Sequence, residues 1–267
     1  MEPAYDTLTD RELEIANQPE TPEEVQCLAF NKSIPRGKQR LFHTVVWYYS
    51  IFEFSRKELG HYAKCFSDQT TGLWSAYRFY HLYRVIRKMK PETVLEFGSG
   101  VSTVFIAEVL RLNEIDFNVK GRVISFEQSE SYYDSLIKNF PESLKEFVEI
   151  KLSLVRLKWC NQYRGIYYDI KQEEIPKSID LVYIDGATRT RGDQKSNFPY
   201  RRLNADIVNL VKWGFEIKYA ITDHRYANLP FYQSELGHSF DVRLVKRWRS
   251  IELKRKSSLR KPEMPSR

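Results

Sequence analysis

Residues 93–103 read TVLEFGSGVST, and this stretch decides the fold. Its first part, TVLEF, is a short apolar run that is typical of a buried strand. Gly98 and Gly100 follow and allow backbone angles and a close approach that side chains would block. Ser102 and Thr103 can then cap a helix whose first amides point at a ligand. The segment therefore predicts a strand, a tight turn that can receive a ligand, and a helix.

Apolar runs alternate with helical stretches along the rest of the chain, which indicates right-handed crossovers and a parallel sheet. Strands are expected at 93–97, 122–127, 147–155, 179–185 and 217–223, and helices at 101–111, 129–140 and 204–214. SFDVRLVKRW and SIELKR are expected to close the sheet as an antiparallel hairpin. We predict an α/β fold with a Rossmann-like, doubly wound, mostly parallel seven-stranded sheet and an N-terminal helical extension. Its ligand would lie at the carboxyl ends of the strands.

Composition divides the chain into three parts. Residues 1–72 form an acidic lead and a helical N-terminal extension, with eight acids and a single base in the first 24 residues. Residues 73–253 form the predicted sheet domain, and residues 254–267 form a basic tail. The net charge of +7 belongs partly to that tail, and charged ends of this kind are more often solvated than bound to a partner.

Several classes of protein are excluded by the pattern of residues. The first residues are acidic, and no run of about 18 apolar residues occurs, so we expect no signal peptide, no membrane span and a cytoplasmic location. Cys27, Cys65 and Cys160 are far apart and lack the spacing of a zinc site, so we expect reduced thiols without a disulfide framework.

Two carboxylates indicate the kind of ligand. Glu96 precedes the glycine turn, where a carboxylate would repel a pyrophosphate and attract the ammonium of a methionine-like ligand. The pattern from Gly98 is G-x-G-x-x-T, which lacks the third glycine of the dinucleotide fingerprint. Glu127 ends the second strand and can accept hydrogen bonds from both hydroxyls of a ribose. The two carboxylates together predict a site for an adenosyl ligand.

These segments resemble class I S-adenosylmethionine-dependent methyltransferases, and more narrowly their small-molecule, bacterial-type branch. The resemblance rests on VLEFGSGVST, VISFEQSESYY, DLVYIDGA and ITDHR. It implies S-adenosyl-L-methionine as the cofactor, with its methionine part near Glu96, its ribose at Glu127 and its methyl group facing Asp185. The implied cofactor-binding residues are Glu96, Gly98, Ser99, Gly100, Ser102, Thr103, Glu127, Gln128, Ser129 and Asp185.

The candidate catalytic residues follow the fourth and fifth expected strands, and they are Asp185, Asp223, His224 and Arg225. In the catechol-type branch of the family, an acid and an acid–amide pair at these places hold magnesium, whereas His224 replaces the amide here. Imidazole suits zinc or manganese better than magnesium. Three interpretations stay open: a divalent metal held by Asp185, Asp223 and His224; a metal-free general base; or structural capping. In the second, His224 or Asp185 would be the base, oriented by Asp223 and steered by Arg225.

The expected function is methyl transfer to a hydroxyl or amine of a small molecule. Polar residues are dense from 185 to 202, which favours a sugar-like or anionic acceptor. One alternative is a nucleic-acid methyltransferase that uses the basic tail, but no motif for methylating a base supports it. The other alternative is a non-catalytic protein that binds an adenosyl ligand. The sequence leaves the oligomeric state open.

Overall fold

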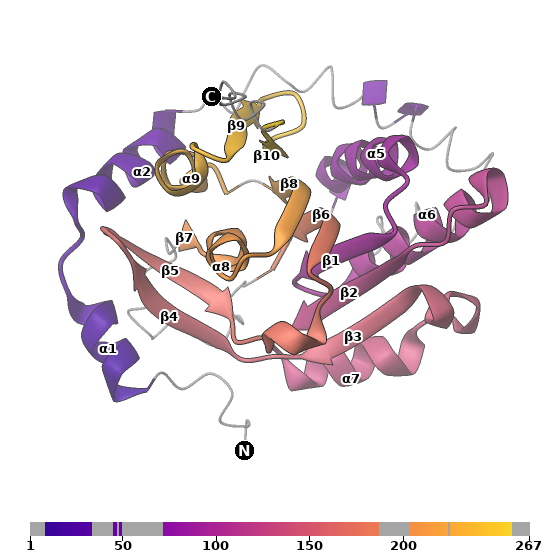
Figure 1. Ribbon diagram of the computed structural model, residues 1–267, viewed down its shortest axis with the longest axis horizontal. Coiled ribbons are helices and arrows are strands. Elements are labelled where there is room, and N and C mark those ends of the chain that lie inside the picture. Colours follow the sequence, from indigo (N-terminus) through magenta and orange to yellow (C-terminus); the bar gives the residue numbers. More distant parts are fainter. Residues whose placement is uncertain are drawn as a thin grey trace, which may run out of the picture.

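The computed structural model describes residues 9–33, 45–46, 48–49, 72–186, 203–223 and 225–257. These residues form two sheets with helices packed around them (Figure 1). The larger sheet contains, in spatial order, β3 (Val148–Leu152), β2 (Arg122–Glu127), β1 (Thr93–Phe97), β6 (Ser178–Ile184), β8 (Glu216–Asp223), β10 (Ser250–Arg255) and β9 (Phe240–Val245). The smaller sheet contains β4 (Val155–Cys160), β5 (Tyr163–Tyr168) and β7 (Leu203–Asn204). The main helices are α1 (Asp10–Asn17), α2 (Pro22–Ser33), α5 (Gly72–Met89), α6 (Val101–Phe117), α7 (Glu130–Asn139), α8 (Asp206–Lys212) and α9 (Asn228–Leu236).

The order of the seven strands confirms the predicted doubly wound sheet. Strand β1 lies inside the sheet, with β2 parallel to it on one side and β6 parallel to it on the other. The chain moves outward through β2 to β3, then returns across β1 to continue through β6 and β8. Strand β10 runs antiparallel to both β8 and β9, so the C-terminal hairpin closes the sheet as expected. The order reverses between β1 and β6, which is where such a sheet opens a crevice for a ligand.

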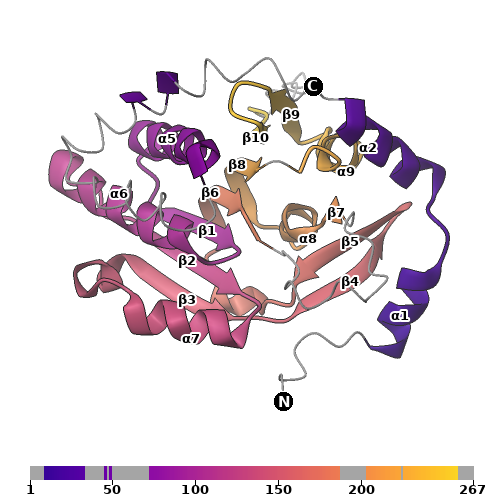
Figure 2. The same cartoon turned by 180° about the vertical axis from the view of Figure 1, so that it is seen from behind.

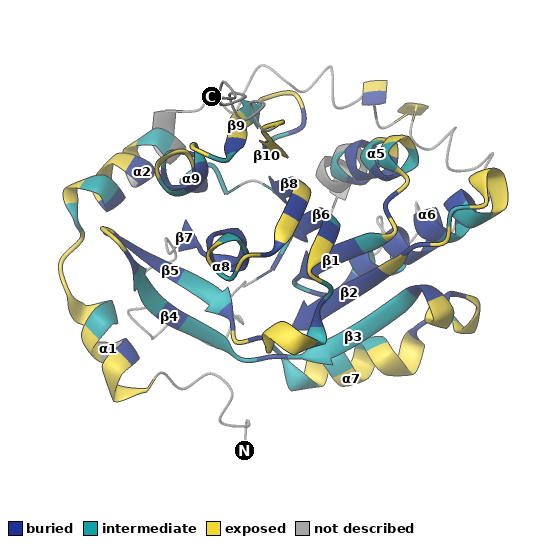
Figure 3. Ribbon diagram, viewed as in Figure 1, coloured by how far each residue is buried: buried dark blue, intermediate teal, exposed yellow. Residues whose placement is uncertain are grey.

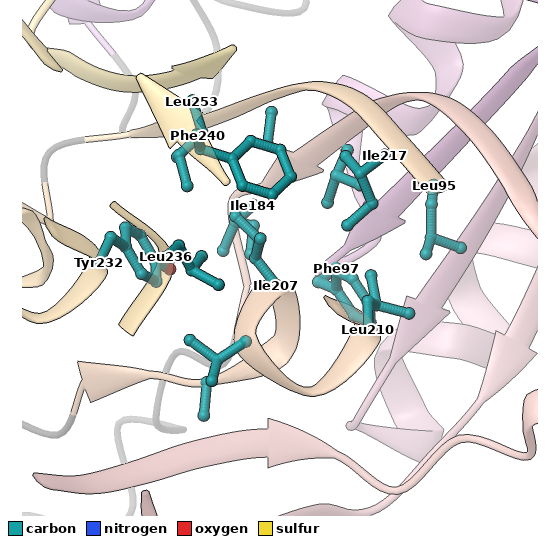
Figure 4. Close-up of a cluster of buried hydrophobic side chains, with 14 of the residues drawn as sticks. Leu95, Phe97, Ile184, Ile207, Leu210, Ile217, Tyr232, Leu236, Phe240 and Leu253 are labelled. Atoms are coloured by element: carbon teal, nitrogen blue, oxygen red, sulfur yellow. The ribbon is translucent and has the colours of Figure 1, made fainter. Parts of the chain in front are cut away.

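Alternating side chains on the central strands build a core on each face of the sheet. Val94 packs with the residues of α5 and α6, whereas Leu95 and Phe97 point to the opposite face. There they join side chains of α8 and α9, including Leu210 and Tyr232 (Figure 4). All five side chains are buried, and each full burial of a large apolar side chain contributes about 1.5–3 kcal/mol. The resulting dark blue band runs through the middle of the sheet (Figure 3).

The N-terminal helices are fixed to the smaller sheet by two buried glutamates. Glu12 of α1 accepts a hydrogen bond from the backbone amide of Leu157 at 2.9 Å. Glu24 of α2 accepts hydrogen bonds from the backbone amide and the guanidinium of Arg164, whose side chain is 1% exposed. Helices α1 and α2 therefore run beside β4, β5 and α9 (Figures 1 and 2). Breaking a buried ion pair of this kind costs about 3–5 kcal/mol.

Two parts of the predicted element pattern are wrong. The expected strand 147–155 ends at Leu152, and Val155 begins β4 of the other sheet. The backbone amide of Ser153 bonds to the carbonyl of Glu127, so the strand leaves the main sheet where β2 ends. Helix α9 was not predicted. Its nine residues, NLPFYQSEL, are too few to show a clear amphipathic period, although Leu229, Phe231, Tyr232 and Leu236 are buried in the core and Gln233 and Ser234 are exposed.

Some expectations fall on residues outside the described ranges. These are the polar loop from 187 to 202, most of the aromatic run 42–54, and residues 258–267 of the basic tail. The division at residues 72 and 253 stays a prediction. Among the helices that the structure describes, none is both long enough and apolar enough to cross a membrane.

Candidate functional site

Three chain segments meet where the strand order reverses. The carbonyl of Phe97 accepts hydrogen bonds from the backbone amides of Asp185 and Gly186, which follow β6. On the other side, the amides of Gly98 and Ser99 bond to the carbonyl of Phe126 at 2.9 and 3.2 Å. The loop after β1 is thus joined by its backbone to both neighbouring strands. This bonding gives the predicted glycine turn a fixed shape.

Gly98 is required by the protein's own backbone. Its φ of +98° lies in the region that favours glycine. A Cβ there would lie 2.1 Å from the Cα of Gly186. Glycine was expected here for its backbone angles and for close approach of a ligand; the positive φ confirms the first reason, and the close contact that the structure shows is with the loop of Gly186. Gly100 differs, because a Cβ added to it would meet only Tyr132, with its Oη 3.5 Å away.

Glu96 lies beneath the glycine turn and is fully buried. Its Oε2 accepts hydrogen bonds from the hydroxyls of Thr103 at 2.6 Å and Ser125 at 2.7 Å. The Ser102 hydroxyl also lies near the carboxylate and favours its charged form, but Oε1 itself has no hydrogen bond of good geometry among the described residues. Burial raises the pKa of Glu96 to about 7, although the hydroxyls around it favour the charged form. A buried acceptor without a donor costs about 1–3 kcal/mol, so this oxygen is a place where a ligand's donor would bind favourably.

The other predicted residues of the turn are engaged in holding it. The Oγ1 of Thr103 also accepts a hydrogen bond from the amide of Gly100 at 2.8 Å. Ser99 and Ser125 are joined through their hydroxyls at 2.7 Å, and both side chains are buried. Ser102 lies in the first turn of α6 and is buried as well. These hydroxyls form one network around Glu96.

Glu127 ends β2 close to the glycine turn. Its Oε1 accepts a hydrogen bond from the amide of Ser129 at 2.8 Å, and burial raises its pKa. The side chain of Ser129 accepts from the amide of Tyr132 and so caps α7, while Gln128 is half-buried between the two. The turn therefore orients the carboxylate of Glu127.

Tyr132 is a site residue that the sequence analysis missed. It lies in the first turn of α7, and its hydroxyl comes within contact distance of the place where a Gly100 side chain would begin. Burial raises its pKa, and the nearby charges of Glu127 and Asp185 raise it further. Tyr132 is thus close enough to both Glu127 and Asp185 to be affected by their charges. The only signal in the sequence is the pair of tyrosines in VISFEQSESYY.

The structure brings Asp185 and Asp223 together at the ends of neighbouring strands. Their carboxylates lie within hydrogen-bond range of each other, and Arg78 of α5 pairs with both, with Nη2 3.6 Å from Asp185 Oδ2 and Nη1 bonded to Asp223 Oδ2. Arg225 contributes a second guanidinium, with Nε 3.7 Å from Asp223 Oδ1. Burial and then the Asp223 carboxylate raise the pKa of Asp185 to about 7, against the opposing charge of Arg78. Arg78 was missed because it lies 145 residues before Asp223.

His224 lies outside the described residues, so its proposed roles as a base or a metal ligand stay predictions. Among the residues that are described, no three His, Cys, Asp or Glu side chains gather closely enough to hold a metal ion. The two carboxylates that were expected to contribute to such a site face guanidinium groups. The two described members of the expected ligand set are therefore paired with arginine, and a metal at this place stays a prediction.

A cavity of about 1050 Å³ lies elsewhere, between α5 and the strands β8, β9 and β10. Its lining includes Tyr80, Arg84, Lys88, Trp248 and Lys254. In the sheet register, Lys254 pairs with Tyr219, well before β8 ends at Asp223. The cavity is thus distinct from the crevice between β1 and β6. We place the candidate site at the crevice, because the convergent polar groups and shifted pKa values lie there.

No protein-family model matches this sequence, and no curated protein is significantly similar to it. Solved structures with a related arrangement include an O-methyltransferase from Bacillus cereus, with 12% identity, a TM-score of 0.40, and 94% of this chain and 100% of that chain covered. The O-methyltransferase TomG from Streptomyces achromogenes has 11% identity, a TM-score of 0.40, and 88% and 100% coverage. A methyltransferase from Geobacter sulfurreducens has 12% identity, a TM-score of 0.37, and 90% and 100% coverage. Function is therefore inferred from the residues of the site.

Proposed function

We propose that this chain is an S-adenosylmethionine-dependent methyltransferase that acts on a hydroxyl or amine of a small molecule. The observation that carries the proposal is the unpartnered Oε1 of Glu96, buried beneath a glycine turn at the reversal of the strand order. An ammonium group is a donor of the right charge for that oxygen. A pyrophosphate would instead be repelled, which argues against a dinucleotide at this turn.

The remaining residues of the crevice fit the rest of the cofactor. Glu127 would accept hydrogen bonds from the ribose, and the first turn of α6 would favour a carboxylate. Tyr132 would cover the glycine turn, where its ring and hydroxyl already lie against Gly100. Asp185 follows β6, which lies on the other side of β1 from the strand that Glu127 ends, and it would face the acceptor. When bound, the cofactor supplies an activated methyl group, and the chain supplies position and proton removal.

The test is calorimetry with S-adenosylmethionine, S-adenosylhomocysteine and NAD. We expect both adenosyl ligands to bind and NAD to bind far more weakly, because only NAD brings a pyrophosphate to Glu96. Tighter binding of NAD, or no binding of either adenosyl ligand by the folded chain, would reject the proposal.

A binding protein without catalysis is the first rival, and one observation favours it. Asp185 and Asp223 are held in ion pairs, as structural carboxylates often are. The side chains of Asp185 and Asp223 are nevertheless 24% and 12% exposed, so an acceptor can reach them. Transfer of a labelled methyl group to any member of a panel of phenols, sugars and amines would exclude this rival.

Nucleic-acid methylation is the second rival, and the basic cavity beside α5 is the observation in its favour. Arg84, Lys88 and Lys254 are exposed there next to the ring of Trp248. Binding of single-stranded DNA that weakens steeply with salt would support this rival. Methyl transfer to small acceptors with no such salt dependence would support the main proposal.

A further inference from the structure

The guanidinium of Arg78 contacts both Asp185 and Asp223, whose carboxylates also lie within hydrogen-bond range of each other, so it is the cation that this pair already holds. Its Nη2 lies 3.6 Å from Asp185 Oδ2, and its Nη1 bonds to Asp223 Oδ2. One planar guanidinium thus connects the ends of β6 and β8. A metal ion shared by Asp185 and Asp223 would have to connect the same two strand ends. Arginine suits this task because its nitrogens diverge in a fixed fork and its charge is permanent.

Arg225 strengthens the same arrangement from the other side. Its Nε lies 3.7 Å from Asp223 Oδ1, and its Nη2 donates to the carbonyl oxygen of Asp185 at 3.3 Å. Two guanidinium charges therefore face two carboxylates. A divalent ion entering here would be repelled by both arginines and would have to displace at least one of them.

We propose that Arg78 replaces a divalent metal as the cation of the acceptor side, and that it positions Asp185 and Asp223 there. The proposal rests on the proposed function only for the identity of the molecule that these carboxylates face. It identifies Arg78 as a positioning residue, since it acts through the two aspartates.

The side-chain exposures agree with this role. The Arg78 side chain is 19% exposed, and those of Asp185 and Asp223 are 24% and 12% exposed. The three groups are thus covered enough for strong mutual attraction, yet they still border the crevice. A surface ion pair would be screened by solvent and would hold neither carboxylate in place.

The test is titration of the apo protein with Mn²⁺, followed by calorimetry and by the electron paramagnetic resonance signal of free Mn²⁺. We expect no saturable Mn²⁺ site in the wild type. Arg78→Met should gain a saturable Mn²⁺ site, at least about tenfold tighter than the non-specific binding of the wild type, because it removes the guanidinium that contacts both carboxylates. That gain should disappear when Asp223→Asn is added, and Arg84→Met, an exposed arginine of the same helix, should behave as the wild type.

Saturable Mn²⁺ binding by the wild type that is lost in Asp185→Asn would overturn the proposal, and this result does not depend on how Arg78→Met folds. Equal Mn²⁺ affinity in the folded Arg78→Met variant and the wild type would overturn it as well. S-adenosylhomocysteine binding in the presence of a chelator is measured separately. Its absence would reject the proposed function while leaving the Mn²⁺ result unaffected.

Discussion

Gly98 and Gly186 pack backbone against backbone, so that a Cβ added to either would lie 2.1 Å from the Cα of the other. This contact joins the loop after β1 to the loop after β6 at the point where the strand order reverses. The two halves of the crevice are thus set against each other without side chains between them.

Gly98→Ala is therefore expected to destabilise the fold. The new methyl group would meet backbone, and the positive φ adds strain, so the free energy of unfolding should fall by at least about 2 kcal/mol. Gly100→Ala is the matched control, and it should cost less than about 1 kcal/mol because its methyl group has room. Urea unfolding measures both. Equal losses for the two variants would contradict the packing described here.

Glu127→Ala is expected to weaken the binding of S-adenosylmethionine by about 1.5–3 kcal/mol, the scale of a hydrogen bond to a charged group. Calorimetry measures this change, and thermal melting checks that the variant folds. Asp134→Ala removes an exposed carboxylate from the neighbouring helix α7 and should leave affinity unchanged. If Glu127→Ala folds and binds as the wild type does, the ribose lies elsewhere.

Binding of a cationic ligand at Glu96 is expected to release protons near neutral pH. The pKa of Glu96 is raised to about 7 by burial, so about half of the molecules carry this proton at pH 7. An ammonium beside the carboxylate favours its charged form and lowers the pKa, which releases up to about half a proton per ligand. Calorimetry in buffers of different ionisation enthalpy measures the release. Glu96→Gln should abolish it, and a proton uptake by the wild type would argue against an ammonium at this position.

Glu252 is expected to make stability depend on acidic pH. Burial alone would raise its pKa, but His81, Tyr219 and Arg243 outweigh burial and lower the pKa from 4.5 to about 2. The stabilisation is therefore complete above pH 4.5 and is lost as the pH falls towards 2, by about 3 kcal/mol in total. Glu252→Gln should lack this part of the pH dependence, whereas Glu216→Gln, an exposed residue of the same sheet, should retain it. If the free energy of unfolding of the wild type and of Glu252→Gln falls by the same amount between pH 4.5 and pH 2, the assignment to Glu252 is contradicted.

The central strands could be predicted from the sequence because strands buried on both faces have continuous apolar runs. TVLEF, RVISFE and IDLVYID are such runs, and each forms a strand within one residue of the expected bounds. Strands β4 and β5 could not be separated in this way. VRLKWC and YRGIYY carry charges, so they are not continuous apolar runs. The break before them lies where the amide of Ser153 bonds to the carbonyl of Glu127, a contact that the local sequence does not show.

The positions of the candidate residues could be predicted where a single segment of the chain contains the whole feature, and their roles stay predictions. The glycine turn, Glu96 and Glu127 each depend on their neighbours in the chain and on the order of the strands. Arg78 could not be found, because its position on an amphipathic helix gives no indication of a partner 145 residues away. The orphan oxygen of Glu96 was also hidden, since the sequence does not show which hydroxyls would satisfy its other oxygen.

The docking of α1 and α2 has a consequence for the order in which the chain assembles on the ribosome. Glu24 is 140 residues ahead of its partner Arg164, and Glu12 is 145 residues ahead of Leu157. At about 5–20 residues per second, synthesis takes about 7–30 s to deliver those partners, so the two helices emerge long before they can dock. Until then their glutamates are solvated and the apolar side of α2 has nothing to cover it. Nascent chains stalled before β5 should therefore leave this N-terminal region open to protease, and longer ones should protect it.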